Sequence, residues 1–109
     1  MGKYHLGEFE EVVMLTVCVL HGQAYGIAII DEMEKQLGRK VSIGSLQTVL
    51  RRLEDKGLLE SELGEATKIR GGKRKRFFKP TSQGRKVLEE TKEQRMKLWN
   101  AIPQIALKD

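Results

Sequence analysis

Residues 42–58 read SIGSLQTVLRRLEDKGL and have the pattern of an amphipathic helix with both ends marked. Ser42 can cap the N-terminus and Gly57 can end the helix, which predicts a helix over residues 43–56. One face is apolar and is expected to pack on a core; it consists of Leu46, Val49, Leu50 and Leu53. The opposite face carries side chains that can hydrogen-bond to bases or phosphates, namely Ser45, Gln47, Thr48, Arg51 and Arg52. The stretch therefore predicts a packed helix with a polar reading face.

Two more helices are predicted before this one. From Glu8 to Leu20 apolar residues recur at helical spacing and cover several faces, which predicts a buried helix with Cys18 as a buried structural thiol. A second helix is expected over about residues 25–37, ended by Gly38. Its inward side chains are Ile29, Ile30, Met33 and Leu37.

A hairpin and a last helix are predicted after residue 57. Strands are expected over residues 58–63 and 74–79, separated by a ten-residue loop with three glycines. Because neighbouring side chains on a strand alternate faces, one of Phe77 and Phe78 should be part of the core. Thr81 can cap the last helix, and Pro103 should kink or end it near Ile102.

Positive charge is concentrated in this hairpin region. Between Lys68 and Lys86 lie nine Lys and Arg and no acid, so the remaining sequence is net negative although the whole chain is +5. A one-sided basic segment is typical of a protein that binds a polyanion. The loop of the hairpin is therefore expected to contact phosphates.

The order of elements predicts the fold class. Three helices, a strand, a basic loop, a second strand and a last helix form the winged helix-turn-helix order, in which the third helix enters the major groove and the hairpin wing lies along the backbone. The chain is expected to be mainly α with a small β-hairpin (α+β), with a DNA-binding domain over residues 1–80 and a dimerisation helix over residues 81–109. Only 39% of its 109 residues are hydrophobic, which favours association.

Several segments together resemble the PadR-type transcriptional regulators. They are LGEFEEVV at 6–13, AYGI at 24–27, RKVSIGSL at 39–46, LRRLEDKGL at 50–58, RGGKRKRFF at 70–78 and TSQGR at 81–85, within about residues 6 to 99. The resemblance implies a dimeric winged-helix regulator, usually a repressor, whose last helix makes the dimer contact. The brief C-terminal segment resembles the short-C-terminus subfamily. Most members have a tyrosine where this chain has Gln47, so the operator is expected to differ accordingly.

These arguments predict three groups of site residues. The DNA-binding group is Ser42, Ser45, Gln47, Thr48, Arg51, Arg52, Arg70, Lys73, Arg74, Lys75 and Arg76. The dimerisation group recurs every three or four residues, a spacing that fits a helix packed lengthwise on a partner's helix or one docked on its own domain; it is Leu88, Thr91, Arg95, Leu98, Ile102 and Ile105. Trp99, Met96 and Phe9 form the third group, for which two interpretations stay open: Trp99 anchors the dimer interface, or, as the resemblance implies for some short members, it stacks a planar hydrophobic effector.

Other classes of function have little support in the sequence. His5 and His21 are sixteen residues apart with no neighbouring ligands, and Gly71-Gly72-Lys73 lacks the other residues of a phosphate-binding loop, so neither a metal nor a nucleotide site is predicted. No nucleophile paired with a base is visible, and we expect no enzyme activity and no cofactor. A spanning segment and an apolar signal core are both absent, which predicts a cytoplasmic location. Two alternatives to DNA binding are a wing that binds an acidic partner protein and, ranked lower, RNA binding.

Overall fold

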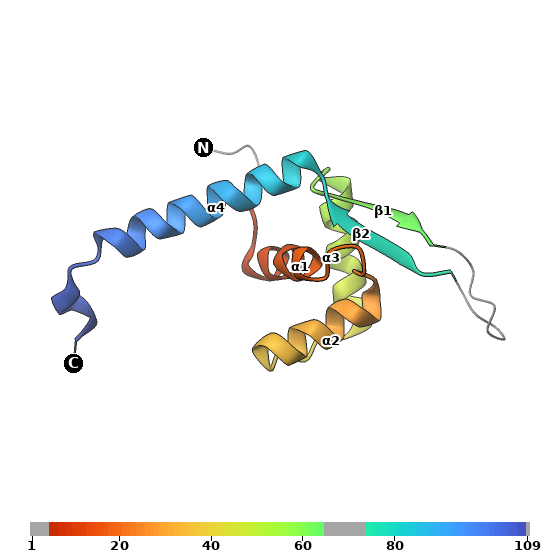
Figure 1. The fold of residues 1–109 in the computed structure, drawn as a ribbon, viewed down its shortest axis with the longest axis horizontal. Helices are drawn as coiled ribbons and strands as arrows, with labels where there is room; N and C mark the ends of the chain where they lie inside the picture. Colours follow the sequence, from red (N-terminus) through yellow and green to blue (C-terminus); the bar gives the residue numbers. More distant parts are fainter. Residues whose placement is uncertain (1–4, 65–73, 109) are drawn as a thin grey trace.

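A computed structural model describes residues 5–64 and 74–108 of the chain. The helices are α1 (Glu8–Val19), α2 (Gly26–Leu37), α3 (Ile43–Asp55) and α4 (Ser82–Ala101), the strands are β1 (Leu59–Leu63) and β2 (Arg76–Pro80), and a 3₁₀ turn covers Gln104–Leu107. Helices α1, α2 and α3 form a central cluster, with the hairpin extending from one side and α4 from the other (Figure 1). The molecule is accordingly elongated, with extents of 60 × 32 × 21 Å. This arrangement confirms the predicted winged helix-turn-helix fold.

The core lies between the first three helices and the base of the hairpin. Each helix directs its apolar stripe inward, and the largest fully buried side chains are Met14, Ile29, Met33, Leu46, Leu53 and Leu58. Burying a side chain of this kind stabilises the fold by about 1.5–3 kcal/mol, and this holds α3 with its polar face outward.

The helix ends follow the predicted signals. The Ser42 Oγ accepts a hydrogen bond from the Ser45 N–H at 3.1 Å, which caps α3. Gly38 ends α2 in the left-handed conformation, with a φ of 63°. Thr81 Oγ1 accepts from the Gly84 N–H at 2.9 Å and donates to the Gly57 carbonyl at 2.6 Å. Thr81 therefore caps α4 and also joins it to the end of α3.

The hairpin is antiparallel and is attached to the helices through β2. Ser61 pairs with Phe78, and the Phe78 N–H donates to the Ala24 carbonyl at 2.8 Å. Phe78 is buried while Phe77 is half-buried, so the expectation that one of the two is a core residue is confirmed. The strands begin one and two residues later than predicted. The tip of the predicted loop, residues 65–73, lies outside the described residues.

Helix α4 is buried against the body only over its first half, and farther along it contacts the body through the Arg95–Glu11 ion pair. At Gly84 an added Cβ would overlap the Leu58 carbonyl oxygen and lie 3.0 Å from Met14 Cε, so only glycine allows this approach. Val87, one turn later, is also buried. The helix stops at Ala101, just before Pro103, as predicted. No helix in the described residues is long and apolar enough to cross a membrane.

Two expectations about burial were wrong. Leu15, Cys18 and Val19 are exposed on α1, and Leu37 is exposed at the end of α2. The physical reason is that the other described elements of one chain cover only the sides of α1 and α2 that face the cluster. Partial burial nevertheless raises the pKa of the Cys18 thiol, against an opposite effect of the Arg85 charge. The thiol therefore stays protonated near neutral pH, which disfavours reactivity.

Candidate nucleic-acid interface

The polar face of α3 is exposed because the opposite face is held in the core. All five side chains predicted to form the reading face are exposed: Ser45, Gln47, Thr48, Arg51 and Arg52. The exposed face divides into two flanks. Gln47 and Arg51 lie on the flank next to the wing, whereas Ser45 and Thr48 lie on the flank next to the N-terminal end of α1.

A groove of about 650 Å³ joins the first flank to the wing. Gln47 and Arg51 line it from α3, and Arg74, Lys75 and Arg76 line it from the second strand and the residues before it. The predicted helix residues and the described wing residues thus meet in one concave surface. Four of these five side chains are cationic and Glu54 is the one acidic lining residue, so the groove carries the net positive charge that a phosphate backbone requires.

Tyr25, at the N-terminus of α2, holds the wing beside α3. The Lys75 Nζ lies 4.1 Å from the centroid of the Tyr25 ring, and the Phe77 ring packs edge-on against the same ring at 5.6 Å. Within the wing, the Arg76 guanidinium donates to Ser61 Oγ at 3.1 Å, and Arg74 Nε donates to the Gly64 carbonyl at 2.7 Å. These contacts orient the wing cations. The predicted contacts Arg70 and Lys73 lie outside the described residues.

The second flank contains basic residues that the sequence analysis did not single out. Arg39 and Lys40 line a cavity of about 480 Å³ together with Ser45 and Thr48. The hydroxyls on this flank already have partners in the chain: Ser42 caps α3, and Thr48 Oγ1 donates to the Gly44 carbonyl at 3.0 Å. Two adjacent basic residues, separated from the predicted cap Ser42 only by Val41, were the available signal. Lys40 is therefore a further candidate for a phosphate contact.

A buried carboxylate at the start of α1, that of Glu10, binds the C-terminal end of α3. The Glu10 carboxylate accepts from Lys56 Nζ at 2.8 Å and from the Gly7 N–H at 2.9 Å. Burial opposes ionisation, but these hydrogen bonds and the charges of Lys56 and Arg52 outweigh it and lower the pKa of Glu10. The pair therefore fastens the C-terminal end of α3 to α1 while Glu10 is ionised.

The predicted dimerisation residues lie along α4 in two different environments. Leu88 and Thr91 are half-buried, and Thr91 Oγ1 donates to the Val87 carbonyl at 2.8 Å. Arg95 is turned toward its own chain, where it pairs with Glu11 at 2.8 Å. Leu98 is 72% exposed, Ile102 is half-buried, and Ile105 is exposed in the 3₁₀ turn beyond the helix.

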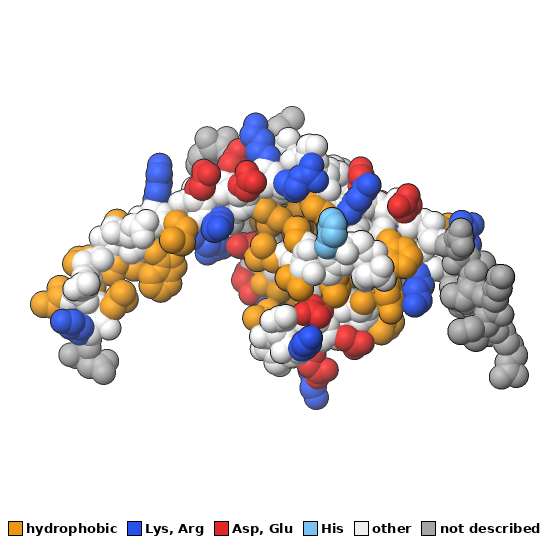
Figure 2. All heavy atoms as spheres, viewed as in Figure 1, with side chains coloured by type: hydrophobic (Ala, Val, Ile, Leu, Met, Phe, Trp, Pro, Cys, Tyr) orange, Lys and Arg blue, Asp and Glu red, His pale blue; other side chains and the backbone are white. Residues whose placement is uncertain are grey.

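The three predicted effector residues are divided between two regions of one chain. Met96 and Trp99 are exposed near the end of α4, which extends away from the helical cluster (Figure 1). Figure 2 shows hydrophobic side chains gathered at this end of the molecule. Phe9 instead lies on α1, with the Arg39 guanidinium 5.0 Å from its ring centroid. In the described part of the chain no three His, Cys, Asp or Glu side chains are grouped to hold a metal.

The sequence and the fold are similar to those of known transcriptional regulators. A PadR-like transcription factor from Bacteroides fragilis is 30% identical and matches over 84% of each chain, with a TM-score of 0.70. A PadR family transcriptional regulator from Eggerthella lenta is 28% identical over 94% of this chain and 88% of its own, also with a TM-score of 0.70. A PadR-like regulator from Bacillus cereus, at 24% identity and a TM-score of 0.64 over 88% of this chain and 94% of its own, shares the fold. No curated protein matches the sequence.

The family assignment rests on most of the chain. The model of the transcriptional regulator PadR-like family matches residues 14–90, which include α2, α3 and both strands. These proteins are transcriptional regulators and not enzymes, which confirms the expectation that the chain has no catalytic activity and implies that it binds DNA. By its sequence and its fold, the chain belongs to the PadR-like family of transcriptional regulators.

Proposed function

We propose that the protein is a cytoplasmic, sequence-specific repressor that binds double-stranded DNA through α3 and the wing. The observation that carries this proposal is the single groove in which Gln47 and Arg51 of α3 face the cations of the wing. An α-helix fits the major groove, whose phosphate walls lie on either side of it. Gln47 and Arg51 would contact base edges, while Lys75 and Arg76 would contact the backbone.

We further propose that the protein acts as a homodimer joined by α4. Residues 1–80 would form the DNA-binding domain and residues 81–109 the dimerisation region. The support is the exposure of large apolar side chains at the end of α4, where Leu98 is 72% and Trp99 is 60% exposed. Exposed apolar clusters of this kind are typical of association surfaces. A dimer would present two reading helices to a two-fold symmetric operator.

A small-molecule effector would release the repressor from DNA. Trp99 and Met96 would provide an apolar, aromatic surface between the two subunits, where a planar compound could stack. Phe9 would belong to this site only if the partner's α4 reaches α1, because in one chain Phe9 packs against Arg39. An effector acts by binding the free dimer more tightly than the DNA-bound dimer.

Footprinting on the DNA upstream of the protein's own gene tests the proposal. We expect the protein to protect one DNA segment from cleavage even when excess random duplex is present. Affinity should increase with duplex length until both half-sites of the operator are included. Protection should weaken for Gln47→Ala. The exposed amide Gln36, on α2, offers a control as Gln36→Ala. Transcription in vitro from the same fragment should fall when the protein is added. The protein-interaction alternative would be favoured if random duplex abolished the binding to this DNA and if the protein bound to an immobilised acidic protein.

A further inference from the structure

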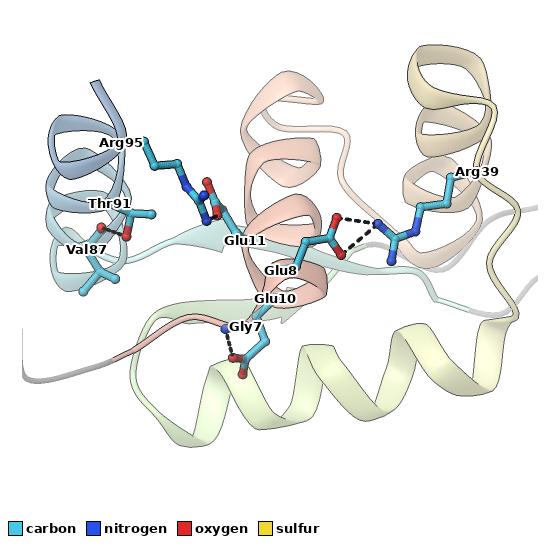
Figure 3. Close-up of polar contacts among 8 residues, drawn as sticks. All are labelled: Gly7, Glu8, Glu10, Glu11, Arg39, Val87, Thr91 and Arg95. Carbon is cyan, nitrogen blue, oxygen red and sulfur yellow. Dashed lines mark hydrogen bonds and ion pairs between the residues drawn. The ribbon is translucent and has the colours of Figure 1, made fainter. Parts of the chain in front are cut away.

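Three acidic residues in the first turn of α1 each hold a different part of the molecule. Glu8 pairs with Arg39 at 2.8 Å, Glu10 with Lys56 at 2.8 Å and Glu11 with Arg95 at 2.8 Å. Figure 3 shows Glu8 and Glu11 directed from the same turn toward Arg39 and Arg95. One helical turn is therefore a junction between segments that are far apart in sequence.

Two of these pairs secure the ends of the reading helix. Arg39 precedes Ser42, the residue that caps α3, by three positions, and Lys56 is the residue at the C-terminal end of the same helix. The third pair, between Glu11 and Arg95, belongs to α4. The acidic turn thus contacts α4, the connection that precedes α3, and the C-cap of α3 through direct side-chain contacts.

Helix α4 contacts the body of the chain in two regions along its length. The first is the close approach of Gly84 to Leu58 and the burial of Val87. The second is Arg95, eleven residues after Gly84 and therefore about 16 Å along the helix axis. The end of the helix at Ala101 is about 25 Å from Gly84, so a small rotation at the first attachment moves that end considerably. The Arg95 pair extends the contact of α4 with the body beyond the half-buried Thr91, so it restricts the direction of the outer part of the helix.

We propose that the Glu11–Arg95 ion pair is a positioning contact that sets the spacing of the two half-sites the dimer recognises. This inference rests on the proposed dimeric DNA-binding function. If the subunits join through the end of α4, the angle between α4 and α1 determines how far apart the two α3 helices lie. Half-sites read by such dimers are separated by about one helical turn of DNA, 34–36 Å, so this angle selects among spacings.

The expected effect is a loss of spacing selectivity, not a loss of binding. Glu11 is largely buried in the pair while Arg95 remains more than half exposed. A pair of this exposure changes an equilibrium by roughly twofold to fivefold. Each reading helix would keep its own contacts with a half-site, because neither Glu11 nor Arg95 lines the groove beside α3.

The first measurement is the distance between spin labels within one chain. Cys18 is the only cysteine, so a Cys18→Ser background allows labels at Gln36→Cys on α2 and Asn100→Cys on α4. Excess unlabelled protein keeps both labels within a single subunit of each dimer. In the otherwise unchanged protein we expect a narrow distribution of distances between the two labels. The distribution should broaden in Arg95→Gln and in Glu11→Gln, and the double variant should be no broader than either single variant. Arg95→Lys keeps the charge, so its distribution should stay narrow. Lys92→Gln removes the same charge one turn earlier on α4 and should leave the width unchanged.

The second measurement compares affinities for a series of duplexes. The half-site sequence is first selected from a random pool, and the distance between two copies of it is then increased or decreased by one or two base pairs. Arg95→Gln should keep its affinity for a single half-site. Its preference for the best spacing over the other spacings should fall by roughly twofold to fivefold. Equal distance distributions in all variants, or broadening with unchanged spacing preference, would overturn the inference while leaving the proposed function intact. A chain that sediments as a monomer, free and on DNA, would overturn both.

Discussion

The Lys75 ammonium lies 4.1 Å from the centroid of the Tyr25 ring, and this contact attaches the wing to the N-terminus of α2. Phe77 packs on the same ring, so the tyrosine is held between two side chains of the wing. Cation–π contacts at exposed sites contribute about 0.5–1 kcal/mol. That is enough to bias the wing toward one orientation, in which its cations share a groove with the reading face of α3.

The wing should supply affinity that is independent of sequence. The double substitution Lys75→Ala and Arg76→Ala removes two cations from the groove, so binding to every duplex should weaken. The slope of log K against log salt should become shallower by about one to two units. Salt titrations on operator and random duplexes provide the measurement. Lys92→Ala with Lys97→Ala removes the same charge from exposed positions on α4 and serves as the control; an equal change of slope there would contradict the assignment.

The reading face of α3 should supply discrimination between sequences. Gln47→Ala or Arg51→Ala removes a side chain that can make a two-point contact with a base, worth about 1–3 kcal/mol of discrimination. Affinity for the operator should therefore fall while affinity for random duplex changes little. Competition binding with both duplexes measures the ratio. Equal losses on the two duplexes would reassign these residues to the backbone.

The order of elements could be predicted because each one has a local signal. The caps at Ser42 and Thr81 and the stop at Gly38 are determined within a few residues of sequence, and the structure confirms all three. The contacts of Tyr25 with the wing could not be predicted, because they join residues about fifty positions apart. The exposure of Cys18 was missed for a similar reason. Periodicity shows that a face is apolar, whereas only the tertiary arrangement shows whether one chain covers it.

The Glu10–Lys56 pair should make stability depend on pH in the acid range. The pKa of Glu10 is lowered in the folded protein, so its contribution is present above the pKa of an unfolded glutamate, near 4.3, and is lost as the pH falls through the folded value. Glu10→Gln should cost about 1–2 kcal/mol at pH 7, since it leaves Lys56 without its partner in a partly buried site. Urea unfolding measures the free energy of unfolding of the wild type and of Glu10→Gln. The difference between these two free energies should be smaller below pH 4 than at pH 7. Glu90→Gln, on α4, is the control; a difference for Glu10→Gln that does not change with pH would contradict the argument.

The apolar end of α4 should hold the dimer together. Leu98→Glu would place a carboxylate in the proposed interface, and burying an unpaired charge costs several kcal/mol, so the variant should be monomeric at micromolar concentration. Sedimentation velocity distinguishes the two states. Gln83→Glu adds the same charge to an exposed position in the first turn of α4, far from this end, and should remain dimeric. A wild-type protein that is itself monomeric at micromolar concentration would remove the interface from this region.

The single tryptophan gives a direct test of the effector site. Trp99 is 60% exposed in one chain, so its fluorescence should shift to shorter wavelength on dimerisation and should be quenched when a planar aromatic compound stacks on it. An inducer must bind the free dimer more tightly than the DNA-bound dimer. The operator must therefore lower the affinity of the dimer for the compound by the same factor by which the compound lowers its affinity for the operator. We would therefore titrate planar cationic and phenolic compounds with and without operator. Saturable quenching that operator weakens supports an inducer site. No response across the panel, together with a Trp99→Ala variant that only loses dimer stability, would leave Trp99 as an interface anchor.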